Sequence, residues 1–334
     1  MHRPGIFYTD DFLKHDYSGH IECKERLELT VSRLKNGPLS ERLQYISPMA
    51  ASAEDLEAVH SPSYVHRTLN FGEGMLDADT YMSDGSAVAA LKAAGAATEG
   101  VKEALAGRGL SVALVRPPGH HALPDRAMGF CIFNNAAVGA AYALKSVKRA
   151  MIVDWDVHHG NGTERMFYDR PDVLYFSVHE YPHFPGTGRA EDAGRGEGEG
   201  FNVNVPLPAG STDADYVRTF EEILLPIMGS YRPDLVILSA GYDPHYADPL
   251  GDMRVTEAGF YRLASLVKEG AKKANIVALL EGGYSLEHLP LCVEASLLGF
   301  MGEPYDGKMN EENTVKASGW IQSARGIQKK YWRL

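Results

Sequence analysis

The stretch MIVDWDVHHGNG, residues 151–162, joins a hydrophobic run to a polar, glycine-containing loop. In an extended chain alternate side chains share a face, so Asp154, Asp156 and His158 point the same way at the end of a strand. A lone Asp-x-Asp pair would be explained best by a solvated strand end. With a histidine at the next alternate position and glycines after it, the pattern favours a metal site.

The same sequence of a buried strand and a polar loop recurs along the chain. Short runs typical of buried strands occupy residues 111–115, 150–153, 173–177, 235–239 and 276–280. Helical patterns alternate with them over residues 84–106, 135–145, 214–228 and 257–273. This alternation predicts an α/β fold with a central, mostly parallel sheet and helices on both faces. In such sheets ligands bind where strands end in loops.

The chain has 334 residues, of which 44% are hydrophobic and 23% charged, as in an ordinary folded enzyme. No linker separates two cores and no repeat is present. The glycine-rich stretch 186–200 does not open a helix after a strand, so we expect a long surface loop near the site rather than a phosphate-binding loop. Residues 303–334 carry no recognisable chemistry.

Charge and cysteine content exclude several classes of function. The net charge of -11 argues against partners that are nucleic acids or anionic membranes. The first 19 residues contain no apolar run, so we expect neither a signal peptide nor a membrane anchor there. The predicted location is the cytoplasm. The three cysteines form no CxxC pair, so any metal must be held by histidines and carboxylates.

A catalytic zinc ion usually takes three protein ligands and leaves one position for water. Asp156 and His158 therefore need a third ligand. A later strand end offers Asp243, His245 and Asp248, and their spacing alone does not choose among them. Each could equally be a turn residue beside a proline.

Two further strand ends carry groups suited to proton transfer and charge stabilisation. RPPGHH, residues 116–121, ends in two adjacent histidines, whose rings titrate near neutrality. LEGGYS, residues 280–285, presents Tyr284, whose phenol could stabilise an oxyanion. Alone, two adjacent histidines more often lie on the surface without a function, and a tyrosine in a loop more often only packs against its neighbours. With a metal they supply the parts needed to hydrolyse an amide.

The order and spacing of these motifs over residues 8–302 resemble the histone deacetylase superfamily. The motifs are RPPGHH (116–121), GFCIFNN (129–135), DWDVHHGNG (154–162), FPGTG (184–188), NVPL (204–207), SAGYD (239–243), DPL (248–250) and LEGGY (280–284). Trp155, Asn161 and the LEGGY form of the last motif resemble the class II branch and its bacterial relatives, which include acetylpolyamine amidohydrolases. The resemblance implies one arginase-deacetylase-like domain over residues 1–334.

The resemblance also implies roles for the site residues. The ligands of one catalytic zinc ion would be Asp156, His158 and Asp248, with Asp243 and His245 as neighbours only.

His120 and His121 would handle protons, and Tyr284 would stabilise the oxyanion. Asp154 would orient His120, and Asn161 would lie behind His121. A neutral amide there, where class I enzymes carry a carboxylate, leaves His121 less biased toward its protonated form, so His121 is the predicted general base.

Members of the family also bind structural monovalent cations. One potassium site would use Asp154, Asp156, His158, Ser177 and Val178. A weaker site would use the backbone around Phe167, Arg170, Val173 and Phe201.

The substrate channel implied by the resemblance consists of Gly129, Phe130 and Phe184, which would grip an aliphatic chain. Leu250 lies at the gate, where polyamine-selective members of the class II branch have a glutamate. Arg26 matches an arginine of the inner cavity, although an isolated arginine in a helical segment is more often a solvated charge.

The predicted function is zinc-dependent removal of acetyl or other acyl groups from acylated amines, with acyl-lysine favoured and acetylpolyamine as the alternative. Two other functions are weighed against it: a binuclear manganese ureohydrolase, and a non-catalytic binder of acyl-lysine. A homo-oligomer is compatible with the sequence, and a second subunit could narrow the entrance.

Overall fold

The computed structural model describes residues 3–272, 274–312 and 314–334. Its central sheet has eight strands in the order β2-β1-β5-β10-β9-β6-β7-β8, and all neighbouring strands are parallel. The strands are β1 (Gly5–Phe7), β2 (Gln44–Ile46), β5 (Leu110–Ala113), β6 (Ala150–Asp154), β7 (Val173–Glu180), β8 (Asn202–Leu207), β9 (Leu235–Ala240) and β10 (Asn275–Leu280). A short antiparallel pair, β3 (Gly74–Met75) and β4 (Tyr81–Met82), lies outside this sheet.

The predicted parallel α/β architecture is confirmed. All five predicted strands are present with small shifts at their ends. The strands β1 and β2 were not predicted, because three residues are too few for a periodic signal. The strand β8, which follows the glycine-rich loop, was also not predicted.

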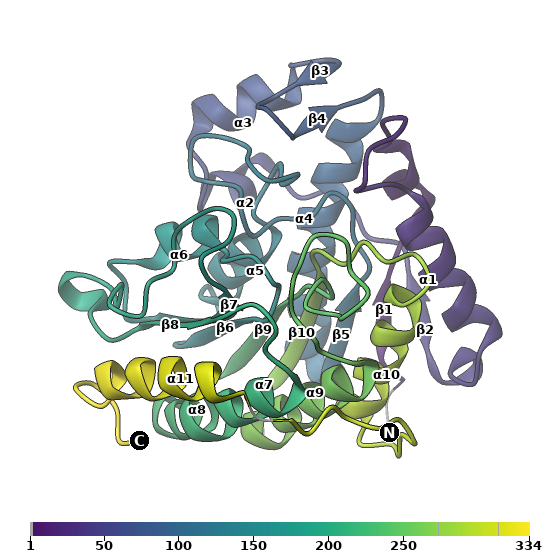
Figure 1. The fold of residues 1–334 in the computed structure, drawn as a ribbon. Coiled ribbons are helices and arrows are strands. Elements are labelled where there is room, and N and C mark those ends of the chain that lie inside the picture. Colours follow the sequence, from purple (N-terminus) through teal and green to yellow (C-terminus); the bar gives the residue numbers. More distant parts are fainter. Residues whose placement is uncertain (1–2, 273, 313) are drawn as a thin grey trace.

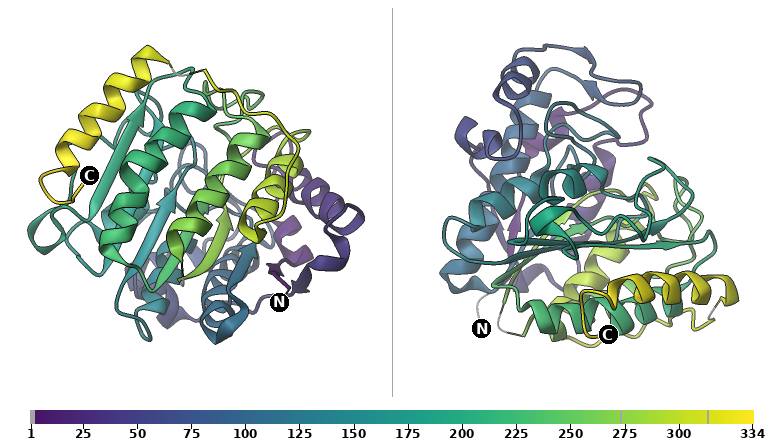
Figure 2. Two further views of the ribbon diagram at one scale, coloured as in Figure 1. Left: turned by 90° about the horizontal axis from the view of Figure 1, so that it is seen from below. Right: turned by 90° about the vertical axis from the view of Figure 1, so that its left-hand side faces the viewer.

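Helices cover both faces of the sheet (Figure 1). The view from below in Figure 2 shows long helical segments side by side on one face. They are α7 (Asp213–Thr219) continued as α8 (Leu225–Tyr231), α9 (Glu257–Ala271), α10 (Leu289–Met301) and α11 (Val315–Gln328). On the other side lie α4 (Ser86–Glu103), α5 (Asn135–Ala143), α2 (Ala53–Glu57), α3 (Pro62–Leu69) and α6 (Asn161–Phe167), whereas α1 (Glu25–Asn36) packs against α10.

Two of the four predicted helices include a wider turn in the structure. The predicted helix 214–228 is split by a wider turn at Phe220–Leu224. The helix predicted over 84–106 continues into a similar turn at Ala104–Arg108. The predicted end of the helix at residue 273 lies outside the described residues. Among the described residues, no helix combines the length and the apolar character that a membrane crossing requires.

The alternation Asp-Trp-Asp at the end of β6 separates the core from the site. Trp155 is fully buried and packs against the rings of Phe220, Phe260 and Phe300, at 6.4, 6.5 and 6.2 Å between centroids. Its two neighbours in sequence therefore point away from this aromatic cluster, as alternate residues of an extended chain must. Packing of one large side chain thus orients both aspartates.

The glycine-rich loop and the C-terminal segment both pack on the β7-β8 side of the sheet. The carbonyl of Gly188 lies 2.9 Å from Nε2 of His179, and a Cβ atom at Gly188 would lie 2.5 Å from that nitrogen. The helix α11 packs against β8, and its Ala317, Ile321 and Ala324 are buried in the main core. The tail therefore covers the edge strand of the sheet.

Candidate active site

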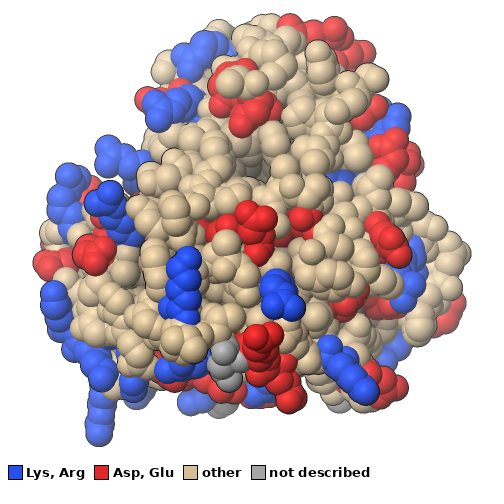
Figure 3. All heavy atoms as spheres, viewed as in Figure 1, with Lys and Arg blue, Asp and Glu red and all other residues tan. Residues whose placement is uncertain are grey.

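A cavity of about 340 Å³ opens where the strands end in loops. Its walls come from loops far apart in the sequence and include Asp79, His120, His121, Gly129, Phe130, Cys131, His158, Phe184, Leu250, Asp252 and Tyr284. Figure 3 shows basic and acidic side chains interspersed on one face of the molecule, with acidic groups gathered near its middle. Many of the predicted site residues therefore line this one cavity.

The predicted metal ligands Asp156 and His158 are close together. Nδ1 of His158 lies 3.0 Å from Oδ1 of Asp156 and 3.2 Å from Oδ2 of Asp243. Ligand atoms about 2.0–2.2 Å from a tetrahedral zinc ion lie roughly 3.3 Å from one another. All three side chains are buried, and Oδ2 of Asp243 has no hydrogen-bond partner among the described residues. This donor set fits a zinc ion.

Asp248 is buried beside this group but is engaged with backbone. Its Oδ2 accepts hydrogen bonds from the backbone N–H of Tyr284 (2.5 Å) and of Ser285 (3.2 Å). The compact group of donor atoms contains Asp156, His158 and Asp243. The geometry thus leaves the third ligand to be chosen between Asp243 and Asp248, and the assignment of Asp248 remains a prediction.

The two histidines have different partners, as predicted. Nδ1 of His120 lies 3.1 Å from Oδ2 of Asp154, whereas Nδ1 of His121 lies 2.8 Å from Oδ1 of Asn161. The rings lie side by side, 4.0 Å apart between centroids. Because the oxygens can only accept, each Nδ1 carries a proton and each Nε2 is left for the cavity.

The charges around the two rings separate their protonation states. Burial opposes the charged form of His120, but Asp156 and Asp154 outweigh it and raise its pKa well above the ordinary value. A cation bound at Asp156 would offset the first of these charges and leave the second. Burial lowers the pKa of His121, and the nearby His120 and His158 lower it further. His121 is therefore the neutral ring.

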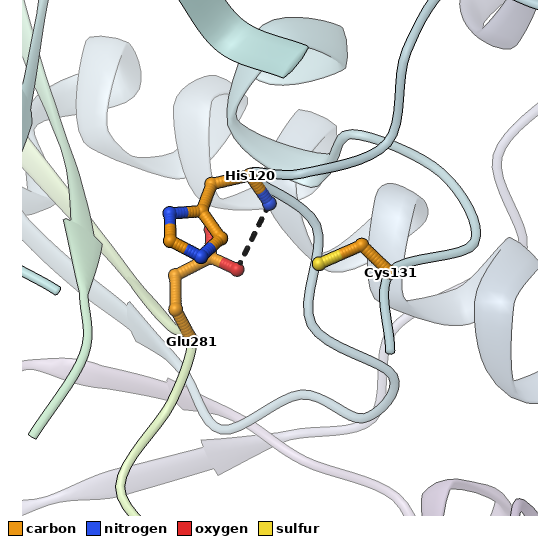
Figure 4. A group of neighbouring side chains, drawn as sticks. All are labelled: His120, Cys131 and Glu281. Atoms are coloured by element: carbon orange, nitrogen blue, oxygen red, sulfur yellow. Dashed lines mark hydrogen bonds between the residues drawn. The ribbon is translucent and has the colours of Figure 1, made fainter. Parts of the chain in front are cut away.

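Glu281 was not predicted as a site residue, yet it supports the histidine pair. Its Oε2 accepts hydrogen bonds from the backbone N–H of Gly119 (2.6 Å) and of His120 (3.2 Å), and its Oε1 accepts from the hydroxyl of Ser239 (3.0 Å). Figure 4 shows this carboxylate beside the ring of His120, with the thiol of Cys131 pointing toward them.

The three side chains in Figure 4 also have metal-ligating atoms close together. The oxygens of Glu281 are already engaged in hydrogen bonds, and burial raises the pKa of Cys131 well above the ordinary value. A cysteine binds a metal as the thiolate, which this raised pKa disfavours. The three side chains are therefore better suited to positioning the His120 loop than to binding a metal.

Arg26 is fully buried behind Tyr284, so the alternative of a solvated helix charge is wrong. Its Nε donates to the carbonyl of Gly283 and its Nη2 to the carbonyl of Glu281, both at 2.6 Å. The guanidinium carbon lies 4.8 Å from the centre of the Tyr284 ring. Arg26 therefore holds the turn that presents the tyrosine to the cavity.

Glu22, which was not predicted either, neutralises this arginine and another. Its Oε1 accepts from Nη1 of Arg26 (2.7 Å) and from Nε of Arg116 (2.6 Å), and its Oε2 accepts from Nη2 of Arg116 (2.9 Å). All three side chains are buried. The spacing of Glu22 and Arg26, four residues apart, was the one signal in the sequence.

Gly129, Phe130 and Phe184 line the cavity together, as the channel prediction requires. The ring of Phe184 meets His121 edge-on at 5.2 Å, and that of Phe130 meets Tyr284 edge-on at 5.9 Å. Gly129 has φ +56°, and a Cβ atom there would lie 2.6 Å from the His121 ring. Glycine is therefore needed at this position.

Leu250 also lines the cavity, and its place at the entrance remains a prediction. Two carboxylates, Asp79 and Asp252, lie on the same walls. A cationic group of a substrate would therefore meet acidic side chains even without a glutamate at Leu250.

The residues of the first predicted potassium site lie along neighbouring strands. Asp154 pairs with Ser177 in the register of β6 and β7, and Val178 follows on β7. At the second site, the carbonyl of Phe167 accepts from the N–H of Arg170 and that of Phe201 accepts from the N–H of Tyr175, at 3.0 and 2.9 Å, while Val173 begins β7. Both potassium sites remain predictions.

Replacing Glu22 by Gln is expected to destabilise the protein, because Arg26 and Arg116 would stay buried without their counter-charge. Breaking a buried ion pair in this way costs about 3–5 kcal/mol. Urea denaturation followed by circular dichroism would measure the loss. The control is Asp169→Asn at the exposed ion pair with Arg195, which should leave the midpoint unchanged. Equal stability of the Glu22→Gln variant and the unmodified protein would contradict this role.

Comparison with known proteins agrees with the fold and with these motifs. The family model for the histone deacetylase domain matches residues 20–300. A probable deacetylase of Archaeoglobus fulgidus is 36% identical, with 98% of each chain covered. The histone deacetylase-like amidohydrolase of Pseudomonas aeruginosa is 41% identical over 82% of this chain and 75% of its own. The human polyamine deacetylase HDAC10 is 40% identical over 94% of this chain and 50% of its own.

The crystal structure of the HDA15 HD domain superimposes with a TM-score of 0.93 at 34% identity, covering 99% of this chain and 95% of that one. The eight-stranded parallel sheet flanked by helices is therefore the arginase-deacetylase fold. Taken with the match over residues 20–300, this shows that the chain belongs to the histone deacetylase family.

Proposed function

We propose that this protein is a zinc-dependent deacetylase that hydrolyses the amide bond of acylated amines. The observation that carries the proposal is the pair of histidines beside Asp156 and His158, one held by a carboxylate and the other by a neutral amide. Such a pair separates an acid from a base within one buried cavity.

Asp156, His158 and Asp248 would hold the zinc ion. Zinc, when bound, supplies a Lewis acid that polarises the acyl carbonyl and lowers the pKa of water. The choice of Asp248 over Asp243 rests on the pattern of the family, and the buried, closely spaced donor atoms support a metal here.

His121 would take the proton from the attacking water, since its ring is neutral and its Nδ1–H is held by Asn161. His120, kept protonated by Asp154, is suited to deliver a proton to the leaving amine. Each proton then moves at an Nε2 atom, because both Nδ1 atoms are engaged.

Tyr284 would donate its hydroxyl to the oxygen of the acyl group as negative charge develops there. Burial raises the pKa of Tyr284 well above the ordinary value, so the hydroxyl keeps its proton. Arg26 fixes the turn beneath it. Phe130 and Phe184 would enclose the aliphatic chain of the substrate.

The two other functions receive less support. A binuclear manganese ureohydrolase needs further metal ligands where this chain has His120, His121 and Tyr284, and these histidines are engaged with Asp154 and Asn161. A non-catalytic binder would be expected to lack a ligand, a histidine or the tyrosine, and all of these are present.

Several finer points belong to the same proposal. These are potassium at its two predicted sites, a single deacetylase domain over residues 1–334, and a cytoplasmic location. The substrate would be acyl-lysine or a related acylated amine, with acetylpolyamine as the alternative that the similarity to HDAC10 favours.

Removal of zinc by a chelator is expected to abolish deacetylation, and added zinc should restore it, because the histidines alone cannot activate water sufficiently. The same assay tests the third ligand: Asp248→Asn should weaken zinc affinity much more than Asp243→Asn. Full activity of metal-free protein would refute the mechanism. Zinc loss confined to Asp243→Asn would refute only the choice of ligand.

Replacing Tyr284 by Phe removes one hydroxyl and should lower kcat by about 10²-fold or more, as for loss of an oxyanion donor. Zinc content and the circular dichroism spectrum should not change. A steady-state assay of an acetyl-lysine peptide would measure the effect, and a variant with near-normal kcat would exclude Tyr284 from catalysis.

Replacing Leu250 by Glu should shift the ratio of kcat/KM toward acetylpolyamines. A carboxylate about 4 Å from an ammonium contributes at most about 4 kcal/mol at an effective dielectric constant near 20. A quarter of that value corresponds to a several-fold change in selectivity. The control is Leu250→Gln, because glutamine has nearly the same shape as glutamate but no charge. This variant should not shift the ratio.

The unmodified protein is expected to prefer acetyl-lysine peptides. A preference of tenfold or more for acetylpolyamines would show that Asp79, Asp252 or a second subunit selects the charge, and that Leu250 does not.

A further inference from the structure

Asp252 is an acidic residue on the wall of the cavity to which the proposed mechanism gives no chemical role. It lies in the loop between β9 and α9, shortly after Leu250, and both residues line the cavity. Leu250 is half-buried whereas Asp252 is exposed, so Asp252 lies nearer the surface of the molecule. Among the described residues, the cavity walls contain no lysine or arginine. A positively charged group arriving with a substrate would therefore meet this carboxylate without competition.

The backbone of Asp252 is held on both sides. Its N–H donates to Oε2 of Glu180 at 2.9 Å, and its carbonyl accepts from the N–H of Gly210 at 2.8 Å. The preceding Gly251 is packed so closely that a Cβ atom there would lie 2.6 Å from the carbonyl oxygen of Asp243. The segment therefore has little freedom to move, and the carboxylate of Asp252 extends from a fixed point. A fixed group loses less conformational entropy when it binds a ligand.

The carboxylate of Asp252 is not needed to hold the loop. The turn before it is stabilised by Asp248, whose Oδ1 accepts from the N–H of Leu250 at 3.0 Å. The nearest basic residue along the chain, Arg254, lies 3.7 Å from Glu312 instead. The side chain of Asp252 is thus available to a partner that is not part of the chain.

The other carboxylate on the cavity walls, Asp79, is in a different situation. Its Oδ1 accepts from the hydroxyl of Thr80 at 3.2 Å. Burial raises the pKa of Asp79, and the neighbouring Asp77 raises it further. Asp79 is therefore engaged within its own loop, which leaves Asp252 as the better candidate for recognising a positive charge.

We propose that Asp252 is a specificity-determining residue that favours acyl-lysine peptides with a lysine or arginine next to the acylated residue. This inference rests on the proposed deacetylase function. The acylated side chain would fill the channel between Phe130 and Phe184, and the neighbouring peptide residues would stay outside it, at the exposed part of the wall. A flanking cation would meet the carboxylate of Asp252 there in contact with water. Such an exposed ion pair contributes little to affinity but is enough to select among similar substrates.

The test uses two acetyl-lysine peptides that differ only in the residue after the acetyl-lysine, which is arginine in one and its neutral isostere citrulline in the other. At low ionic strength the unmodified protein should have a kcat/KM about threefold to fivefold higher for the arginine peptide, the size expected for an exposed ion pair. The difference should lie mainly in KM, because the contact is remote from the reacting atoms. Added salt should reduce the ratio, since exposed charges are screened.

Two variants assign this selectivity to one side chain. Asp252→Asn keeps the shape of the residue without its charge and should bring the ratio close to one. Asp252→Lys should reverse the preference in favour of the citrulline peptide. The control Glu41→Gln removes an exposed carboxylate just before β2, at the opposite edge of the sheet, and should leave the ratio unchanged although the net charge changes equally. Circular dichroism shows whether each variant is folded.

Equal kcat/KM values for the two peptides in the unmodified protein, or an unchanged ratio in both folded Asp252 variants, would overturn this inference and leave the deacetylase function standing. Deacetylation of neither peptide would refute the proposed function as well. An acetylated polyamine distinguishes the other source of positive charge. If Asp252→Asn lowers kcat/KM for the polyamine and leaves the peptide ratio unchanged, the carboxylate binds a polyamine ammonium, and the assignment to a flanking peptide residue is wrong.

Discussion

All neighbouring strands of the eight-stranded sheet run parallel, so their carboxyl ends lie at one edge. The loops after β5, β6, β9 and β10 therefore leave the sheet side by side and bring together residues far apart in the sequence. This arrangement places carboxylates, histidines and arginines in buried positions. The parallel arrangement of the strands therefore gives both the chemistry of the site and the free-energy cost of burying its charges.

The fold meets part of that cost by giving buried carboxylates several hydrogen-bond donors. Glu22 faces two guanidinium groups, and Glu281 accepts from two backbone N–H groups and a hydroxyl. Because an isolated buried charge is very unfavourable, such residues have little freedom to move. The turns that they hold present His120 and Tyr284, so the supporting charges also give the site its rigidity.

The residues that could be predicted from the sequence are those with a local pattern. Asp154, Asp156 and His158 alternate along one strand end, and the five predicted strands are mainly apolar runs of four or more residues. Glu22 had only its four-residue spacing to Arg26 as a local signal, because its other partner, Arg116, lies 94 residues away in the sequence. Glu281 stood next to a recognised motif, but its contacts with the His120 loop depend on strand order, which the sequence did not reveal.

The loop after β9 concentrates several proposed roles in few residues, because it carries Asp243, Asp248 and Leu250. Oδ2 of Asp248 accepts the backbone N–H of Tyr284 at 2.5 Å, so a candidate metal ligand and the candidate oxyanion donor are joined by one hydrogen bond. A change in the conformation of this loop would move both of them, together with the residue at the entrance. In the proposed mechanism, metal affinity, transition-state stabilisation and substrate selection would therefore be coupled through this loop, and the coupling would arise from backbone contacts as well as from side chains.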